Sequence, residues 1–188
     1  MGVRIGTRGS GRGDGAAEFE DFVRSRSVGL LRTAYLLTGS RADAEDLLQE
    51  VLVSVARRWE HIDEGRTDAY ARTALHRAAI DGWRRRSVRP VVVGAPTSDP
   101  TAEGDAMGAS VDRLVLRDAL ARLTARQRAV LVLRFYEQHT EVEAAAVLGC
   151  SVSTVKSQTR RALQRLRELA PELTETFRPD AQHEEATS

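Results

Sequence analysis

The chain has 188 residues, and its 28 Lys and Arg nearly balance 27 Asp and Glu, so the net charge of +1 neither indicates nor excludes nucleic acid. Its one cysteine, Cys150, excludes an intramolecular disulfide and fits a reducing cytoplasm, where we expect the protein to act. The four histidines lack metal-ligand spacing, and no apolar run approaches the roughly 20 residues that span a bilayer, which argues against a zinc site and a membrane anchor.

The N-terminal segment and the first helix come first in the chain. Residues 1–17 are rich in Gly, lack periodicity and an apolar stretch, and are expected to be disordered rather than a secretory signal. From Phe19 onward, apolar residues follow helical spacing as far as Leu37. Thr38 and Gly39 then predict the end of this helix, since glycine tolerates the left-handed backbone that closes many helices.

A long amphipathic helix is expected next. Ser40, with Asp43 three residues later, is an approximate capping box and predicts its start. Apolar residues then recur along one face: Ala44, Leu47, Leu48, Val51, Leu52 and Val55. The opposite face is acidic and amide-bearing (Asp43, Asp46, Gln49 and Glu50). DNA would repel this face, so it indicates either a protein-binding surface or an ordinary solvated helix surface.

A third helix is expected from about Asp68 to Arg86, where Trp83 is followed by three arginines. Aromatic and basic side chains together suit unpaired bases and phosphates. The alternative is a core tryptophan with a basic helix C-terminus, and from the pattern alone we expect both Trp59 and Trp83 in the core. Residues 89–111 hold three of the five prolines and lose periodicity, which predicts a flexible linker.

Helical spacing returns at Val111 and continues through Leu123. Thr124 with Gln127 is a capping box that opens a further helix. After Pro171 the chain is acidic and is expected to be a disordered tail.

Residues 140–167 are typical of a helix-turn-helix, a unit that places its second helix in the DNA major groove. Thr140 and Glu143 form a capping box, Gly149 suits the turn, and Ser151 suits the N-cap of the second helix. The polar face of that helix carries Ser153, Thr154, Lys156, Ser157, Arg160, Arg161, Gln164 and Arg165. Eleven Lys or Arg against five Asp or Glu between Asp112 and Arg167 give this part a basic excess, which favours DNA over a merely solvated helix pair.

We therefore predict an all-α chain with two small helical domains. They cover residues 18–88 and 112–170, joined by the linker 89–111 and flanked by the extension 1–17 and the tail 171–188. We find no nucleophile–base pair, metal cluster or phosphate-cradling glycine loop, so neither an enzyme nor a cofactor or small-molecule site is expected.

Together these runs resemble the sigma-70 family of RNA polymerase sigma factors. The run DAEDLLQEV (residues 43–51) resembles the polymerase-binding helix of region 2, and YARTALHRAAIDGWRRR (70–86) resembles the next helix of that region. The run LGCSVSTVKS (148–157), with Arg160 and Arg161, resembles region 4. The order of the two regions and the linker are those of the extracytoplasmic-function (ECF) group, which keeps only these two regions.

The resemblance implies partners and residue roles. Core RNA polymerase would be bound at its largest-subunit clamp and its flap, with Asp46, Gln49 and Glu50 facing the clamp. The segment that recognises and melts the −10 element would include Arg77, Asp81, Trp83, Arg84 and Arg85, with Arg84 and Arg85 on phosphate. The −35 duplex would be met by Ser153, Thr154, Lys156, Ser157, Arg160 and Arg161. The resemblance also implies an anti-sigma partner and no cofactor.

Three residues depart from the common family pattern. Arg77 stands where Asn is frequent, which puts the −10 base preference in doubt. Ser153 stands where Gly is frequent and adds a side chain at the start of the second helix of the helix-turn-helix, so the −35 preference can differ. Leu52 replaces an aromatic residue and keeps the position apolar.

The rival interpretations are a dimeric helix-turn-helix regulator that binds DNA without polymerase, and an adaptor that binds no DNA.

Overall fold

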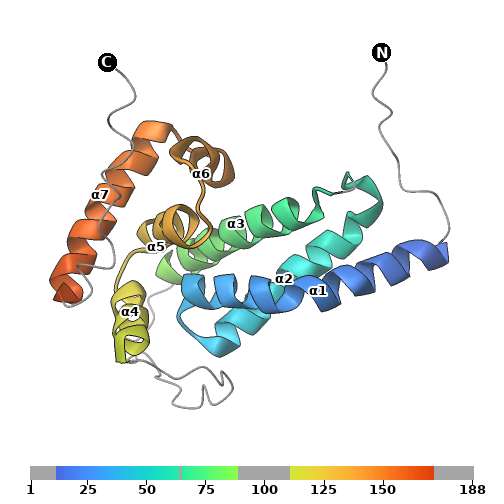
Figure 1. Cartoon of the computed structure of the whole chain (residues 1–188), viewed down its shortest axis with the longest axis horizontal. Coiled ribbons are helices and arrows are strands. Elements are labelled where there is room, and N and C mark those ends of the chain that lie inside the picture. The colour runs from blue at the N-terminus through green and yellow to red at the C-terminus, as the bar shows by residue number, and fades with distance from the viewer. Residues whose placement is uncertain (1–11, 64, 89–110, 172–188) are drawn as a thin grey trace.

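The computed structural model describes residues 12–63, 65–88 and 111–171, and these residues form helices and no strands (Figure 1). Seven α-helices occur in order within this part of the chain: α1 (Arg12–Thr38), α2 (Arg41–Arg57), α3 (Thr67–Val88), α4 (Val111–Ala121), α5 (Ala125–Leu131), α6 (Glu141–Leu148) and α7 (Val152–Leu169). A 3-10 turn, η1 (Trp59–His61), comes after α2, and a π-helical turn, η2 (Val132–Tyr136), continues α5. The all-α prediction is confirmed.

Helices α1, α2 and α3 form the first helical unit. Gly39, with a φ of 76°, ends α1, and the Ser40 hydroxyl accepts a hydrogen bond from the Asp43 N–H to begin α2, as the sequence predicted. The apolar stripe of α2 faces the other two helices. The core of this unit contains Leu30, Ala34, Leu47, Val51, Val55, Ala71 and Leu75. The acidic residues of α2 therefore lie on the outside.

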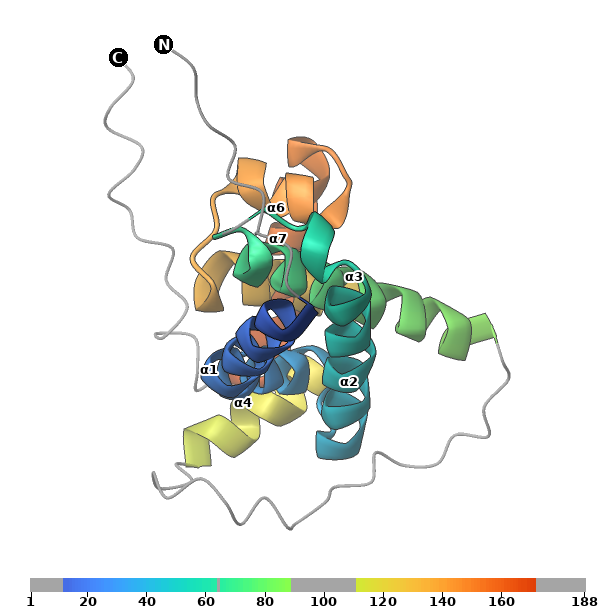
Figure 2. The ribbon, with the colours of Figure 1, turned by 90° about the vertical axis from the view of Figure 1, so that its right-hand side faces the viewer.

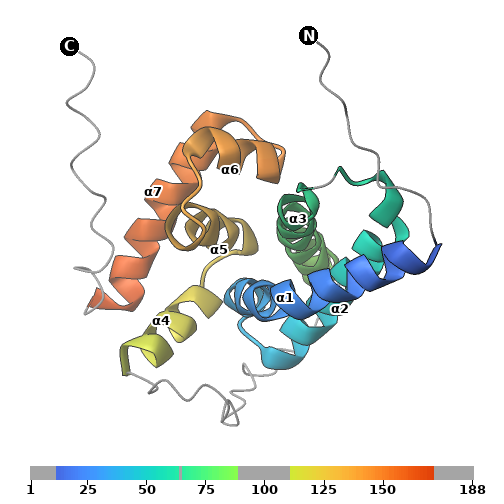
Figure 3. The same ribbon diagram turned by 45° about the vertical axis from the view of Figure 1, so that its right-hand side comes forward.

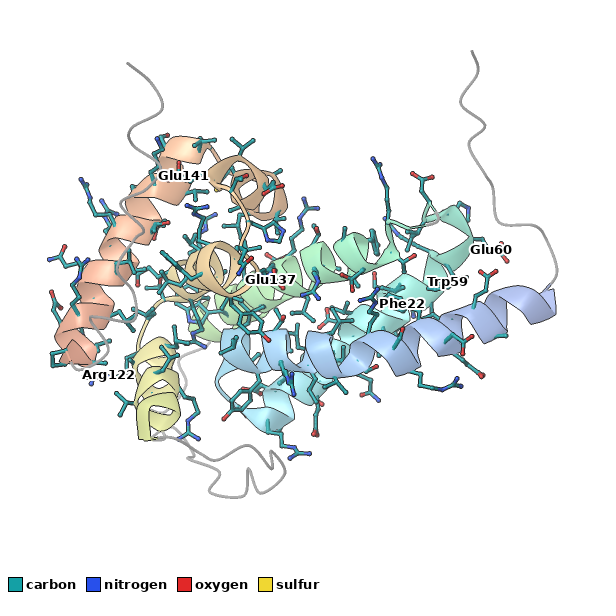
Figure 4. The ribbon with its side chains drawn as sticks, viewed as in Figure 1. Phe22, Trp59, Glu60, Arg122, Glu137 and Glu141 are labelled. Carbon is teal, nitrogen blue, oxygen red and sulfur yellow. The ribbon has the colours of Figure 1, made fainter. Side chains whose placement is uncertain are left out.

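An aromatic cluster closes the far end of this unit. The Trp59 ring packs edge-on against Phe19, with ring centroids 5.2 Å apart. Its centroid also lies 5.6 Å from that of Phe22 (Figure 4). Trp59 also lies against Gly15, where an added Cβ would be 3.7 Å from the indole ring. This packing accounts for a difference from our prediction: α1 begins at Arg12, so residues 12–17 are helical rather than disordered, while residues 1–11 lie outside the described part.

Helices α4 to α7 form the second unit. The predicted capping boxes at Thr124 and Thr140 are both present, so α5 and α6 begin where the sequence indicated. Helix α7 buries Val155, Ala162, Leu163 and Leu166 against α5, α6 and α4. The linker 89–111 and the tail 171–188 fall almost entirely outside the described residues.

The π-helical turn η2 was not predicted, since the periodicity suggested one continuous helix. The N–H of Glu137 donates to the Val132 carbonyl at 2.9 Å, and the N–H of His139 donates to the Leu133 carbonyl at 2.9 Å. Such wide turns insert one extra residue into a helix and so redirect the chain beyond it. Here the turn carries the Glu137 side chain toward the first unit and leads the chain on to α6 (Figure 4).

The two units pack against each other, which the sequence did not predict. In Figure 3, α5 lies between α7 on one side and α1 and α3 on the other. Ala129, Val132 and Leu148 of the second unit join the apolar core of the first. The buried Arg128 donates hydrogen bonds to the carbonyls of Leu37 at 2.7 Å, Ala121 at 3.0 Å and Leu123 at 3.4 Å. These carbonyls lie at the C-terminal ends of α1 and α4, where a cation is favoured.

The two tryptophans differ in burial, and this difference allows the assignment of the core to be tested. Trp59 is 7% exposed and Trp83 is 44% exposed. We expect Trp59→Ala to lower the free energy of unfolding by about 3–5 kcal/mol through the cavity it leaves. As the matched control, Trp83→Ala should change it by no more than about 0.5 kcal/mol. Urea denaturation followed by circular dichroism measures both, and equal effects of the two substitutions would contradict this assignment.

Candidate nucleic-acid and protein interfaces

The outer face of α2 is the first candidate interface. Asp46, Gln49 and Glu50 lie exposed on it, as the helical periodicity predicted. They line a broad surface hollow together with Val53, Ser54, Arg57 and Arg58. Val53 is 47% exposed in the middle of these polar residues. The face therefore combines carboxylates, an amide and an exposed apolar side chain, a combination suited to a protein partner rather than to DNA.

The C-terminal part of α3 is the second candidate interface. Figure 2 shows this end of α3 projecting away from the other helices. Asp81 and Trp83 are exposed there, so our expectation of a core position for Trp83 is wrong, whereas the same expectation for Trp59 is confirmed. Arg84 and Arg85 belong to the helix, but their side chains are outside the described part.

Arg77 is set apart from the other residues predicted for the −10 element. Its Nε donates to the Val147 carbonyl at 3.1 Å, and its Nη2 lies 3.5 Å from the Ala146 carbonyl. Both carbonyls belong to the last turn of α6, where backbone acceptors lack helical partners and the helix dipole attracts a cation. The structure thus brings Arg77 to the helix-turn-helix and leaves Asp81 and Trp83 further along α3.

Helices α6 and α7 form the predicted helix-turn-helix, and their junction fixes the direction of α7. Gly149 ends α6 with a φ of 61°. The Ser151 hydroxyl then accepts a hydrogen bond from the Thr154 N–H at 3.2 Å and caps α7. Cys150 is a half-buried turn residue whose N–H donates to the Ala145 carbonyl. Local chemistry at these few positions therefore orients the second helix, as the sequence predicted.

The polar face of α7 is the third candidate interface. Ser153, Lys156, Arg160 and Arg161 are exposed on it, while Thr154 and Ser157 are partly buried. The Lys156 ammonium lies 3.6 Å from the Glu141 carboxylate of α6, and the Ser157 hydroxyl donates to the Thr154 carbonyl. In Figure 1 this helix lies on the outer side of the second unit, away from α1, α2 and α3. All six residues predicted for duplex binding therefore belong to one helix.

The structure contains a buried polar cluster between the two units that the sequence pattern did not predict. Glu137, on the segment after η2, is only 3% exposed. Its Oε1 accepts hydrogen bonds from Arg72 at 2.8 Å and Thr33 at 3.2 Å, and its Oε2 lies 2.9 Å from the buried His76 Nε2. No pattern in the sequence marks Glu137, because its partners lie 61 to 104 residues away in the chain.

The surroundings of Glu137 also set its protonation. Burial would raise the pKa of this carboxyl, but the hydrogen bond and charge of His76, together with those of Arg72, outweigh it and lower the pKa to about 2. The ionised carboxylate is thus the form that the cluster favours. Elsewhere, the backbone and hydroxyl of Thr140 lower the pKa of Glu143 in the capping box.

Metal and membrane sites find no support in the described residues. Within residues 12–63, 65–88 and 111–171, no group of three or more His, Cys, Asp or Glu side chains is arranged to hold a metal ion. None of the helices in these ranges is both long and apolar enough to cross a bilayer.

Two family matches cover most of the described chain. Residues 17–89 match the family described as Sigma-70 region 2, and residues 119–168 match Sigma-70, region 4. The RNA polymerase sigma-E factor of Streptomyces coelicolor is 43% identical over 152 residues, which cover 80% of this chain and 85% of that protein. The ECF RNA polymerase sigma factor SigL of Mycobacterium tuberculosis is 39% identical, over 77% of this chain and 84% of that protein.

Solved structures agree with these matches. The sigma factor RpoE of Bartonella quintana, crystallised with the anti-sigma factor NepR, superposes with a TM-score of 0.65. It is 26% identical, and the alignment covers 82% of this chain and 97% of that one. CnrH, in complex with the cytosolic domain of CnrY, superposes with a TM-score of 0.53 at 25% identity, over 82% of this chain and 88% of that one.

The low pKa of Glu137 predicts acid sensitivity. Because its pKa in the folded chain, about 2, lies below its ordinary value of 4.5, its stabilising contribution is complete above pH 4.5 and is lost as the pH falls toward 2. We expect the free energy of unfolding of the wild type to fall more steeply over this interval than that of Glu137→Gln, whose amide does not titrate. Urea denaturation at a series of pH values measures the two slopes, and identical slopes would contradict the assignment.

Proposed function

This chain belongs to the sigma-70 family as a sigma factor of the ECF type, and from that premise we propose how its two units divide promoter recognition. The first unit binds core RNA polymerase through the outer face of α2 and captures unpaired −10 bases at the end of α3. The second unit holds the −35 duplex with α7 in the major groove. The observation that supports this division most directly is the exposure of the polar face of α7 on the outer side of the second unit.

The charges of the three interfaces suit these roles. Asp46 and Glu50 on α2 would be repelled by phosphates, whereas they complement a basic protein surface such as a polymerase clamp. On α7, Lys156, Arg160 and Arg161 can pair with phosphates or with guanine, and Ser153 can hydrogen-bond a base edge. The exposed Trp83 ring is available to stack on an unpaired base.

In this mechanism the chain makes and breaks no bond. It lowers the free energy of the open promoter by binding single-stranded −10 bases, and it selects the promoter by duplex contacts at −35. Core polymerase, bound at its clamp and flap, carries out nucleotide addition in the cytoplasm. Since the solved relatives above are bound to CnrY or to an anti-sigma factor, we include an anti-sigma protein among the partners.

The alternative of a helix-turn-helix regulator acting without polymerase is not favoured. It would use the first unit for sensing or dimerisation, whereas residues 17–89 match Sigma-70 region 2. It further predicts dimeric binding to palindromic duplexes.

The α2 face is tested by run-off transcription with purified bacterial core polymerase and promoter DNA from upstream of the chain's own gene. The wild type should confer a discrete start site. The double variant Asp46→Ala/Glu50→Ala should reduce the transcript at least about tenfold, because truncation of central interface residues commonly costs about 2 kcal/mol or more. Glu45→Ala is the matched control, since this exposed carboxylate on the same helix pairs with Arg41 outside the hollow.

If the chain's own promoter is inactive, the same assay is run on a pool of genomic promoter fragments. Absence of any start site there, combined with tight duplex binding without polymerase, would replace the sigma mechanism by the regulator.

The α7 face is tested separately by promoter binding of the holoenzyme at several salt concentrations. Lys156→Ala and Arg160→Ala should each weaken binding and reduce the slope of log affinity against log salt by about 1 for every phosphate that the side chain no longer neutralises. Arg24→Ala is the control, because this exposed cation of α1 pairs with Asp21 and lies on the other unit. Unchanged binding by both α7 variants would favour the adaptor that binds no DNA.

A further inference from the structure

The start of α7 carries three hydroxyl groups that are hydrogen-bonded to one another. The Oγ of Ser151, the N-cap residue, lies 2.9 Å from the Ser153 Oγ and 2.8 Å from the Thr154 Oγ1. The same oxygen accepts a hydrogen bond from the Thr154 N–H at 3.2 Å. Ser151 and Ser153 are exposed and Thr154 is partly buried, so the group lies at the surface. The capping role of Ser151 accounts for the N–H contact but not for the two contacts between hydroxyls.

The number of hydrogens in this group limits the directions of its bonds. A serine hydroxyl donates once and accepts twice. The Thr154 N–H occupies one acceptor position of Ser151, so Ser151 accepts from only one neighbouring hydroxyl and donates its own hydrogen to the other. Of Ser153 and Thr154, one therefore keeps its hydrogen for an outside acceptor, and the other offers only lone pairs. Arrangements in which both hydroxyls donate outward, or both accept, are excluded while Ser151 holds them.

The cationic side chains on the same face cannot supply acceptors. Lys156, Arg160 and Arg161 only donate, so they pair with phosphate or with acceptor atoms of guanine and thymine. The exocyclic amino groups of adenine and cytosine need an acceptor on the protein. Among the six α7 residues proposed for the duplex, only the three with hydroxyl groups offer one. The directions of those hydroxyls thus decide which amino groups this face can bind.

Ser157 shows how a neighbour sets such a direction. Its hydroxyl donates to the Thr154 carbonyl at 2.9 Å, which uses its hydrogen within the helix and leaves its lone pairs for a ligand. For Ser153 and Thr154 the corresponding choice depends on Ser151. In a helix-turn-helix the N-terminal residues of the second helix meet the base edges, so these two hydroxyls lie where bases are read. Contact with DNA also excludes water and strengthens the hydrogen bonds among them.

We infer that Ser151 is a positioning residue for −35 recognition, which orients the hydroxyls of Ser153 and Thr154 so that one donates to the duplex and the other accepts from it. The inference rests on the proposed function, in which α7 reads the −35 duplex. The chemistry recognised by this pair is one acceptor atom and one amino group on the base edges. A duplex that offers two acceptors or two amino groups there is disfavoured, and removal of the Ser151 hydroxyl relieves that restriction.

Three substitutions separate this role from capping. Ser151→Gly removes the hydroxyl, yet glycine caps helices nearly as well as serine. Ser151→Thr keeps a hydroxyl at the same position. The matched control is Ser40→Gly, because Ser40 caps α2 by accepting from the Asp43 N–H at 3.3 Å and lies on the other unit. Circular dichroism melts verify that each full-length variant is folded.

Base preference is measured by transcription with the holoenzyme of each variant. The template is a library made from a promoter that the wild type transcribes, with adjacent base pairs of the −35 element varied two at a time. Relative to the best sequence, Ser151→Gly should transcribe the sequences that the wild type disfavours about two- to tenfold more, the effect of one hydrogen bond. Ser151→Thr and Ser40→Gly should keep the wild-type order of preference.

A double-mutant comparison tests whether Ser151 acts through its two neighbours. In a chain that carries Ser153→Ala and Thr154→Val, no hydroxyl remains for Ser151 to orient. Ser151→Gly should therefore leave the base preference of that chain unchanged, because its effect is not independent of theirs.

The outcomes separate the positioning role from the function on which it rests. A wild type that transcribes no promoter, or that transcribes every −35 sequence equally, overturns the proposed function and the inference with it. If the wild type discriminates and Ser151→Gly discriminates equally, Ser151 only caps α7 and the inference alone is overturned. It is also overturned if Ser151→Thr loses the wild-type order, or if Ser151→Gly still acts where the other two hydroxyls are absent.

Discussion

The packing of the two described units buries one ionised carboxylate, and this burial constrains the residues around it. An ionised group can be taken out of water only where cations and hydrogen-bond donors meet it, and Glu137 finds Arg72, His76 and Thr33 on the opposite unit. A π-helical turn, rather than a regular helix end, carries it there. Arg128 of α5 is a buried cation at the same junction, and it donates hydrogen bonds to carbonyls at the C-terminal ends of two helices.

Apolar contacts between the two units accompany these polar contacts. Ala129, Val132 and Leu148 of the second unit complete the core of the first, and Leu36 of α1 packs against the core of the second. Small apolar contacts tolerate sliding and rotation, whereas a buried carboxylate with fixed donors does not. The junction of the two units therefore combines apolar contacts with one buried ionic cluster.

The surfaces proposed for function lie outside this junction, with one exception. The acidic face of α2, the exposed Trp83 and the basic face of α7 lie at the surface, while Arg77 donates a hydrogen bond to α6. The net charge of +1 thus conceals two surfaces of opposite charge, the acidic face of α2 and the basic face of α7.

The sequence by itself determined the helices, their caps and the outward faces of α2 and α7, because periodicity and capping act over three or four residues. Ser40, Thr124, Thr140, Gly149 and Ser151 all stand where the local pattern placed them. Tertiary structure alone decided that Trp59 anchors the start of α1, that Trp83 is exposed, and that Glu137 joins the units. These outcomes depend on contacts between residues tens of positions apart, for which short-range pattern carries no signal.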